Sequence, residues 1–154
     1  MTYLFRGGDA SLFGSEESVE ALRRAQERGV VLDASHGAYS FDDGVARQAM
    51  ALGVEPNSIS SDTSAFTGHL GSRLQQRALV RAVAAGLGTE QAILACSHVP
   101  GSVLGLEEDW PPNGEVGDFD VIRLTTTPPG AIVDLELLAV MRSGHLTIFE
   151  ARPS

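Results

Sequence analysis

The chain has 154 residues, of which 43% are hydrophobic, and it carries 11 basic against 20 acidic residues for a net charge of -9. This length and composition suit a globular protein that buries one ordinary core, and they exclude a fibrous or disordered chain. The acidic balance, with no run of basic residues, argues against nucleic acid or an anionic membrane surface as a partner.

The basic residues and the cysteine content limit which kinds of site the chain can form. All basic residues are arginine, because the sequence contains no lysine, and Cys96 is the single cysteine. An internal disulfide and a multi-cysteine metal site are therefore excluded. The opening MTYLFRGGDA lacks the apolar core of a signal peptide, and no apolar run reaches the length of a membrane span. These features predict a soluble protein of the cytoplasm.

Strand and helix patterns alternate through the first part of the chain. Residues 2–5 have the apolar pattern of a short strand. Ser15 and the acids after it predict the start of a helix, and Gly29 predicts its end. A second apolar strand is expected over residues 30–34.

The same order then repeats. Asp42 or Asp43 can cap a helix that ends at Gly53, and a strand is expected over residues 58–61. A longer helix is predicted from Leu70 to Gly86. Two shorter helical segments follow, over residues 92–95 with a cap at 89–91, and over residues 100–106.

The last part of the chain changes in pattern. Residues 118–124 and 145–149 alternate between polar and apolar, residues 132–140 are strongly apolar, and residues 128–130 and 143–144 are typical of turns. This tail predicts a small antiparallel sheet. Upstream, the repeated strand-helix order predicts parallel strands with helices packed outside them. We therefore expect an α/β segment over residues 1–110 and an antiparallel β segment over residues 111–154.

Four stretches, in this order and spacing, resemble the C-terminal half of the metal-dependent amidohydrolase superfamily, and most closely its dihydroorotase-like amidohydrolase and deacetylase branch. They are GVVLDASHGAYSF (29–41), NSISSD (57–62), CSHVPGSVLGL (96–106) and GEVGDFDVIRL (114–124). In that branch the first resembles a strand ending in Asp-x-Gly-His-Gly, and the second a strand ending in Ile-Ser-x-Asp. The third resembles a helical Thr-x-Asn-Pro-Ala segment, and the fourth an entry to a β-sandwich.

The resemblance implies a fold and a site. The implied fold is the second half of a (β/α)8 TIM-type barrel followed by a small β-sandwich-like sheet. The implied function is metal-dependent hydrolysis of C–N bonds in small amides or cyclic amides, with a divalent ion, zinc, at the carboxyl ends of the strands. Carried over by position, His36 matches a metal ligand, and Asp62 matches both a metal ligand and the catalytic carboxylate.

Other family features are missing from this sequence. Tyr3 stands where the resemblance implies a ligand histidine, and Val99 stands where the helical motif has asparagine. The bridging carboxylated lysine cannot come from a chain without lysine. Because a hydrolytic metal typically takes three protein ligands, and His36 and Asp62 are two, we expect this chain to bind zinc weakly or not at all.

The expected barrel is also incomplete. A (β/α)8 barrel takes about 250 residues, so three or so strand-helix units would leave parallel strand edges that need covering. Three explanations stay open: a partner chain supplies the first half, two copies of this chain pair their halves, or the reading frame is truncated. We accordingly expect a homo-oligomer or a half-barrel partner.

Each candidate residue also has a plainer explanation. His36 could be a hydrogen-bonded turn histidine, and Asp62 could cap the turn that follows it. If the strand is regular, Asp33 lies on the face opposite His36, and we expect no ligand role for it. Whether Tyr3 or His69 enters the site stays open. Cys96 and His98 are expected in packing and cap positions, and His145 on the surface.

Two functions are therefore compared. The first is an amidohydrolase-like enzyme in which Asp62 takes a proton from the attacking water and hands it to the leaving nitrogen. The second is a non-catalytic, amidohydrolase-derived interaction subunit or remnant. The retained His36 and Asp62 favour the first, whereas Tyr3 and the missing ligands favour the second.

Overall fold

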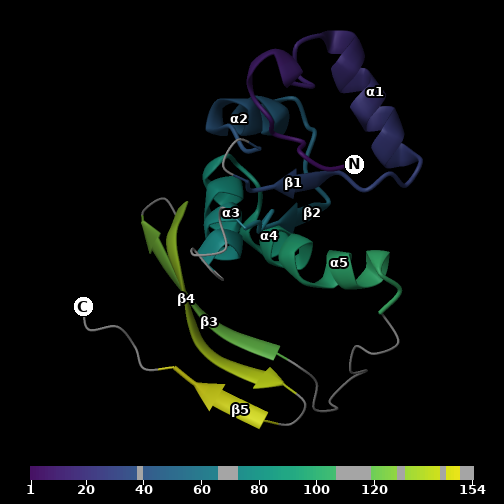
Figure 1. Ribbon diagram of the computed structural model, residues 1–154. Coiled ribbons are helices and arrows are strands. Elements are labelled where there is room, and N and C mark those ends of the chain that lie inside the picture. The colour runs from purple at the N-terminus through teal and green to yellow at the C-terminus, as the bar shows by residue number, and fades with distance from the viewer. Residues whose placement is uncertain (38–39, 66–72, 107–118, 128–130, 143–144, 150–154) are drawn as a thin grey trace. The chain divides into compact units, whose positions relative to one another are not determined.

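A computed structural model of the chain describes residues 1–37, 40–65, 73–106, 119–127, 131–142 and 145–149. The fold is mixed α/β and divides into two compact units, Met1–Pro100 and Gly101–Ser154. Figure 1 shows helices around two short strands in the first unit and a β-sheet in the second. The boundary predicted between residues 110 and 111 lies outside the described residues.

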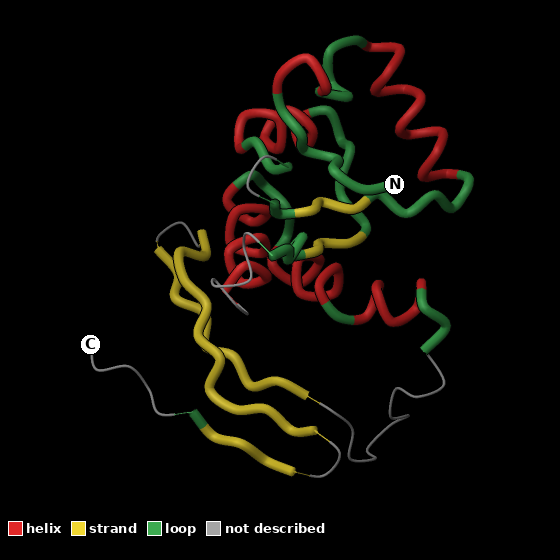
Figure 2. The backbone as a smooth tube through the Cα atoms, in the orientation of Figure 1, coloured by secondary structure: helices red, strands yellow, loops and turns green. Residues whose placement is uncertain are grey.

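The first unit contains a short parallel sheet. Strand β1 (Asp33–Ser35) pairs with β2 (Ser58–Ser60), with Asp33 opposite Ser58 and Ser35 opposite Ser60. Figure 2 shows the two strands side by side. The parallel pairing agrees with the sequence pattern, but β1 begins later than the predicted residue 30. Hydrogen bonding to the segment that contains β2 nevertheless starts before β1, at Leu32, whose carbonyl accepts from the Asn57 and Ser58 N–H groups.

The predicted strand over residues 2–5 is wrong. Tyr3 has a φ of 62°, and the Arg6 N–H donates to the Tyr3 carbonyl at 3.2 Å, which closes a turn. A residue in this left-handed conformation interrupts an extended backbone. The segment still runs along β1, because the Asp33 N–H donates to the Met1 carbonyl at 2.8 Å and the Asp33 carbonyl accepts from the Leu4 N–H at 3.1 Å.

The first two long helices begin and end as their sequences predict. In α1 (Glu16–Glu27) the Ser15 side chain accepts from the Ser18 N–H, and in α2 (Asp43–Ala51) the Asp42 carboxylate accepts from the N–H groups of two residues of the first turn. Asp42, rather than Asp43, is therefore the cap. Gly29 and Gly53 follow with φ of 82° and 69°, the left-handed conformation that commonly ends a helix.

The later helices of the described chain are α3 (Arg73–Ala84), α4 (Thr89–Cys96) and α5 (His98–Val103), and a short 3-10 turn, η1, covers Gly8–Ala10. The predicted start of α3 at Leu70 lies outside the described residues. Helix α4 begins at Thr89, a turn earlier than the predicted residue 92. None of the helices described is both long and apolar enough to cross a membrane.

The second unit carries an antiparallel sheet, as predicted. Its strands are β3 (Phe119–Thr127), β4 (Ala131–Arg142) and β5 (His145–Ile148), hydrogen-bonded in the order β3-β4-β5. The pairing of β3 with β4 shifts register twice, next to Val121 and next to Thr125. The described strands form one layer, so the sandwich-like packing stays a prediction.

The core of the first unit is built from the segments that flank the sheet. Its largest fully buried side chains are Leu4, Phe5, Leu32, Val54 and Ile59. Each such side chain contributes about 1.5–3 kcal/mol relative to an exposed one. Helices α3 and α4 pack beside β2. The N-terminal segment and both strands thus share one apolar centre, and their ends are held at fixed positions.

One carboxylate links the three parallel segments. The side chain of Asp33 accepts hydrogen bonds from the hydroxyls of Thr2 at 2.8 Å, Ser58 at 2.8 Å and Ser60 at 2.7 Å. Hydrogen bonds to an ionised acceptor are stronger than those between neutral groups. Asp33 therefore fixes the register of β1 against β2 and against the N-terminal segment.

We expect Asp33→Ala to lower the free energy of unfolding by about 2 kcal/mol, because the hydroxyls lose a charged acceptor. Urea denaturation followed by circular dichroism measures this loss. Asp9→Ala, which removes an exposed carboxylate, is the matched control and should stay within about 0.5 kcal/mol of the parent. Equal effects of the two substitutions would contradict a linking role for Asp33.

Candidate active site

The two strands of the parallel sheet each lead into a candidate residue. His36 directly follows β1, and Asp62 lies two residues after the end of β2. The His36 N–H donates to the Ser60 carbonyl at 2.9 Å, so the pairing continues to this point. Because the strands are parallel, both residues lie at the carboxyl end of the sheet.

The carboxylate of Asp62 is held by two hydroxyl groups. Its Oδ2 accepts from Ser40 Oγ at 3.0 Å, and its Oδ1 lies 3.5 Å from Tyr3 Oη. Ser40 is buried, whereas Tyr3 is 39% exposed. The tyrosine that stands in place of the implied histidine thus reaches Asp62. His69 lies outside the described residues.

Gly37 makes room for this carboxylate. A Cβ at position 37 would lie 2.0 Å from Asp62 Oδ2 and 2.4 Å from Ser40 Oγ. Both distances are far below van der Waals contact, so a side chain at position 37 cannot coexist with this arrangement. The glycine after His36 is thus required for the approach of Asp62 to the β1 loop.

Backbone strain gathers at the same place. Among the described residues, the non-glycine residues with positive φ are Tyr3, at 62°, and Asp62, at 49°. Such a conformation costs of order 1 kcal/mol for a residue with a side chain. The two strained residues are also the two whose side chains face each other across Oη and Oδ1. Strain of this kind is common at functional sites.

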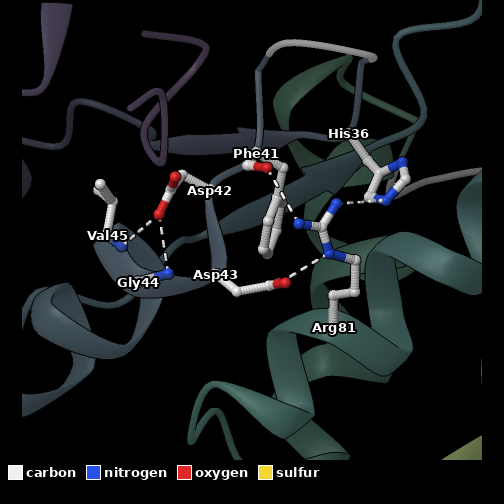
Figure 3. A network of polar contacts seen from close by, with 7 residues as sticks. All are labelled: His36, Phe41, Asp42, Asp43, Gly44, Val45 and Arg81. Atoms are coloured by element: carbon white, nitrogen blue, oxygen red, sulfur yellow. Dashed lines mark hydrogen bonds and ion pairs between the residues drawn. The ribbon is translucent and has the colours of Figure 1, made fainter. Parts of the chain in front are cut away.

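The side chain of His36 has different neighbours. Its Nε2 lies 3.1 Å from an Nη1 of Arg81 in α3, and its ring centroid lies 5.7 Å from that of Phe41 (Figure 3). The imidazole is 8% exposed, and its Nδ1 is fully buried without a hydrogen-bond partner among the described residues. The contacts described for His36 and for Asp62 therefore involve separate groups.

The surroundings of His36 keep it neutral. Burial, and after it the positive charge of Arg81, lowers the pKa of the imidazole below its ordinary value. A neutral imidazole has one protonated nitrogen and one lone pair. Because Arg81 stays protonated and only donates, the lone pair of His36 must lie on Nε2.

This arrangement does not fit a metal at His36. A metal takes a lone pair from a ring nitrogen, and here Nε2 accepts from Arg81 while Nδ1 must carry the hydrogen. Within the described part of the chain, no group of three or more His, Cys, Asp or Glu side chains could hold a metal ion.

The remaining candidates lie elsewhere. Burial raises the pKa of the Cys96 thiol to about 11, so it is protonated and unsuited to metal binding or nucleophilic attack at neutral pH. His98 lies in α5, and His145 begins β5 in the second unit. Sequence reasoning missed Ser40, Arg81 and the hydroxyls around Asp33. Of the sequence features near this site, Gly37 beside His36 was the one that could have indicated a close approach of another group.

No protein-family model matches the chain. A deacetylase from Brucella anthropi and one from Agrobacterium fabrum are each 27% identical to it over 158 aligned residues, covering 99% of this chain and 37% of the relative. The resemblance to the amidohydrolase superfamily is confirmed. The chain spans less than half the length of these curated relatives.

Solved structures agree with this assignment at the level of the fold. A dihydroorotase matches with a TM-score of 0.80 and 24% identity, covering 96% of this chain and 43% of that one. An adenine deaminase matches with a TM-score of 0.72 and 18% identity, covering 96% and 44%. The chain thus has the fold of a part of these amidohydrolase-type proteins.

We expect Gly37→Ala to displace Asp62 from Ser40 and to destabilise the chain by about 1–3 kcal/mol, the usual cost of overpacking. Urea denaturation gives the loss. Gly14→Ala serves as the control, because its added Cβ would come no closer than 3.9 Å to another group. A Gly37→Ala protein as stable as the control would show that Asp62 does not occupy the described position.

Proposed function

We propose that this chain forms part of an amidohydrolase-type active site that hydrolyses C–N bonds in N-acylated compounds or cyclic amides. The support comes from relatives named deacetylases and from structural neighbours that are a dihydroorotase and an adenine deaminase. A dihydroorotase and an adenine deaminase each break a C–N bond with water, a deacetylase removes an acetyl group, and the three names differ in substrate. The reaction type, rather than one substrate, is therefore proposed for this chain.

The pair formed by Tyr3 and Asp62 carries the proposal. Both residues hold a strained backbone conformation, and their side chains meet at the carboxyl end of the parallel strands. That end is where α/β barrels place their catalytic residues. Sparsely populated backbone conformations cluster at functional sites, so two such residues in contact support a positioning role for this pair.

Asp62 is the proton carrier in this proposal. Its carboxylate takes a proton from a water molecule as the water oxygen attacks the carbonyl carbon of the substrate. The same proton passes to the nitrogen as the C–N bond breaks, which leaves a carboxylic acid and an amine. Ser40 donates to one carboxylate oxygen and orients the other toward Tyr3.

The zinc ion that the resemblance implies, with His36 and Asp62 as ligands, stays a prediction. The described contacts of His36 leave no lone pair for it, so the proposed proton transfer contains no metal step. Further ligands would have to come from beyond the described residues, in line with the expectation that this chain alone binds zinc weakly.

A non-catalytic role is the second candidate. It is favoured by the pairing of His36 with Arg81 and by Tyr3 in the place of an implied ligand histidine. In that case the chain keeps the amidohydrolase surface as an interaction subunit. The two candidates differ in whether Asp62 changes a reaction rate.

We expect Asp62→Asn to lower kcat/KM for hydrolysis by at least about 100-fold, because an amide cannot accept the proton of the attacking water. The assay follows amine release from N-acetylated amino acids and cyclic amides, with this chain alone and with the remaining part of the Brucella anthropi deacetylase added. Tyr3→Phe is the matched variant, with a loss of less than about 10-fold because Ser40 still holds the carboxylate. Turnover that is unchanged in Asp62→Asn, or no turnover by the folded wild type in either assay, favours the non-catalytic candidate.

We also propose that a partner completes the parallel sheet of the first unit, either a second copy of this chain or a half-barrel segment of another polypeptide. On the edge of β2 away from β1, the Ile59 carbonyl accepts from the Gln75 side chain at 2.7 Å instead of from a strand. A side-chain amide can be displaced by a strand, which leaves this edge available for pairing.

Light scattering coupled to size exclusion tests the assembly. We expect the purified chain to run as a dimer or larger species, because parallel strands that lack cover expose backbone groups to water. Gln75→Glu should weaken self-association through this edge by placing a charge beside it. A monodisperse monomer that unfolds cooperatively would show that the sheet needs no partner.

A further inference from the structure

The guanidinium of Arg81 is held from three sides. Its Nε donates to Asp43 Oδ1 at 2.8 Å, an Nη donates to the Phe41 carbonyl at 3.0 Å, and the other Nη lies 3.1 Å from His36 Nε2. Its central carbon lies 4.4 Å from the centroid of the Phe41 ring. Figure 3 shows these contacts converging on the guanidinium from the loop after β1 and from the first turn of α2.

These contacts fix the orientation of Arg81 before His36 is considered. A planar guanidinium with two directed hydrogen bonds and a stacked ring has little freedom to rotate. Its hydrogen bond also lowers the pKa of Asp43, so the carboxylate stays ionised in the folded chain. The N–H that points at His36 is therefore a permanent donor in a fixed direction.

A permanent donor at Nε2 selects one form of the imidazole. Nε2 must accept, and a neutral ring then carries its hydrogen on Nδ1. That Nδ1 faces away from Arg81 in Figure 3 and is buried without a partner among the described residues. An unsatisfied buried donor costs about 1–3 kcal/mol. A buried donor without a partner calls for an explanation, and a functional role is one of the recognised ones.

We propose that Arg81 is a positioning residue that presents His36 as a hydrogen-bond donor, through Nδ1–H, to an acceptor oxygen of a bound ligand, a carboxylate or an amide carbonyl. His36 then recognises an oxygen and does not ligate a metal. Arg81 holds the ring in this tautomer and supplies positive charge behind it, which strengthens the donor toward an anionic oxygen. The inference depends on binding alone and holds whether or not Asp62 is catalytic.

Histidine nitrogen NMR measures the tautomer directly. In 15N-histidine-labelled protein at about pH 8, above the ordinary histidine pKa, the long-range spectrum should show His36 with hydrogen on Nδ1 and the lone pair on Nε2. His36→Gln assigns the signal. In Arg81→Met the Nε2–H form should become the major one, because it is the more stable form of a ring without a fixed donor. A wild-type His36 with hydrogen on Nε2 overturns the proposal.

Titration with two probes identifies the acceptor. Acetate offers a carboxylate and acetamide offers a carbonyl, and either should shift the His36 Nδ1 signal in a saturable way. We expect at least about 10-fold weaker binding of the effective probe in Arg81→Met and loss of the response in His36→Gln, since about 1.4 kcal/mol corresponds to tenfold. Arg81→Lys keeps a charge without the directed contacts and should resemble Arg81→Met. No shift with either probe overturns the proposal.

Calorimetric titration with zinc tests the alternative, in which His36 is a metal ligand. The wild-type chain should show no zinc binding that disappears in His36→Gln, because the lone pair on Nε2 is engaged by Arg81 and Nδ1 carries the hydrogen. Submicromolar zinc binding that His36→Gln abolishes overturns the proposal, whatever the hydrolysis assay shows. If Arg81→Met does not fold, the wild-type tautomer and the zinc titration together still decide.

Discussion

The carboxylate of Asp33 is the interaction on which the first unit depends. It joins β1 to two segments that are distant in sequence. It accepts a hydrogen bond from Thr2 of the N-terminal segment on one side, and from Ser58 and Ser60 of β2 on the other. Its backbone groups pair with Met1 and Leu4 at the same time. A slip of one residue between β1 and β2 would turn the serine hydroxyls to the other face of the sheet. The charge at Asp33 therefore selects the register that brings Tyr3, His36 and Asp62 to one end.

Beyond this sheet, His36 and Asp62 are held by opposite means. Asp62 can take its position because Gly37 has no side chain, which leaves the space that the carboxylate fills. His36 is held by a hydrogen bond from Arg81, which lies 45 residues away in sequence on α3. The first arrangement places a carboxylate at the end of β2, beside Ser40 and Tyr3. The second leaves a neutral ring with one donor to offer.

The sequence predicts what depends on neighbouring residues. Ser15 and Asp42 were recognisable as helix caps because the cap and the N–H groups it accepts lie within three residues. The strand over residues 2–5 was mispredicted because the apolar pattern of this segment carries no information about the backbone of Tyr3. The positive φ of Tyr3 interrupts the strand. The positions of His36 and Asp62 followed from the order of parallel strands and from the family resemblance.

Contacts between distant segments were beyond the sequence. Ser58 and Ser60 have the spacing of two residues that places hydroxyls on one face of a strand, but only the register of β1 against β2 puts Asp33 opposite them. Arg81 was one arginine on the polar side of a helix, and nothing nearby pointed to His36. Sequence reasoning therefore found the two residues at the strand ends and missed the groups that decide their chemistry.

The lone pairs of His36 determine which chemistry this end of the sheet can support. A histidine whose two nitrogens faced open space could serve a metal, an acid or a base, and position alone could not distinguish these roles. With Nε2 bound to a permanent donor, the ring can offer a hydrogen but cannot take one without losing Arg81. In the proposed function the base is therefore a carboxylate, Asp62, which has a positive φ and whose oxygens lie within reach of Ser40 and Tyr3. Donor and acceptor are thereby divided between the ends of two adjacent strands. The donor is held by Arg81, which lies outside the four family-like stretches, and the acceptor is held by Ser40, which lies inside the first of them.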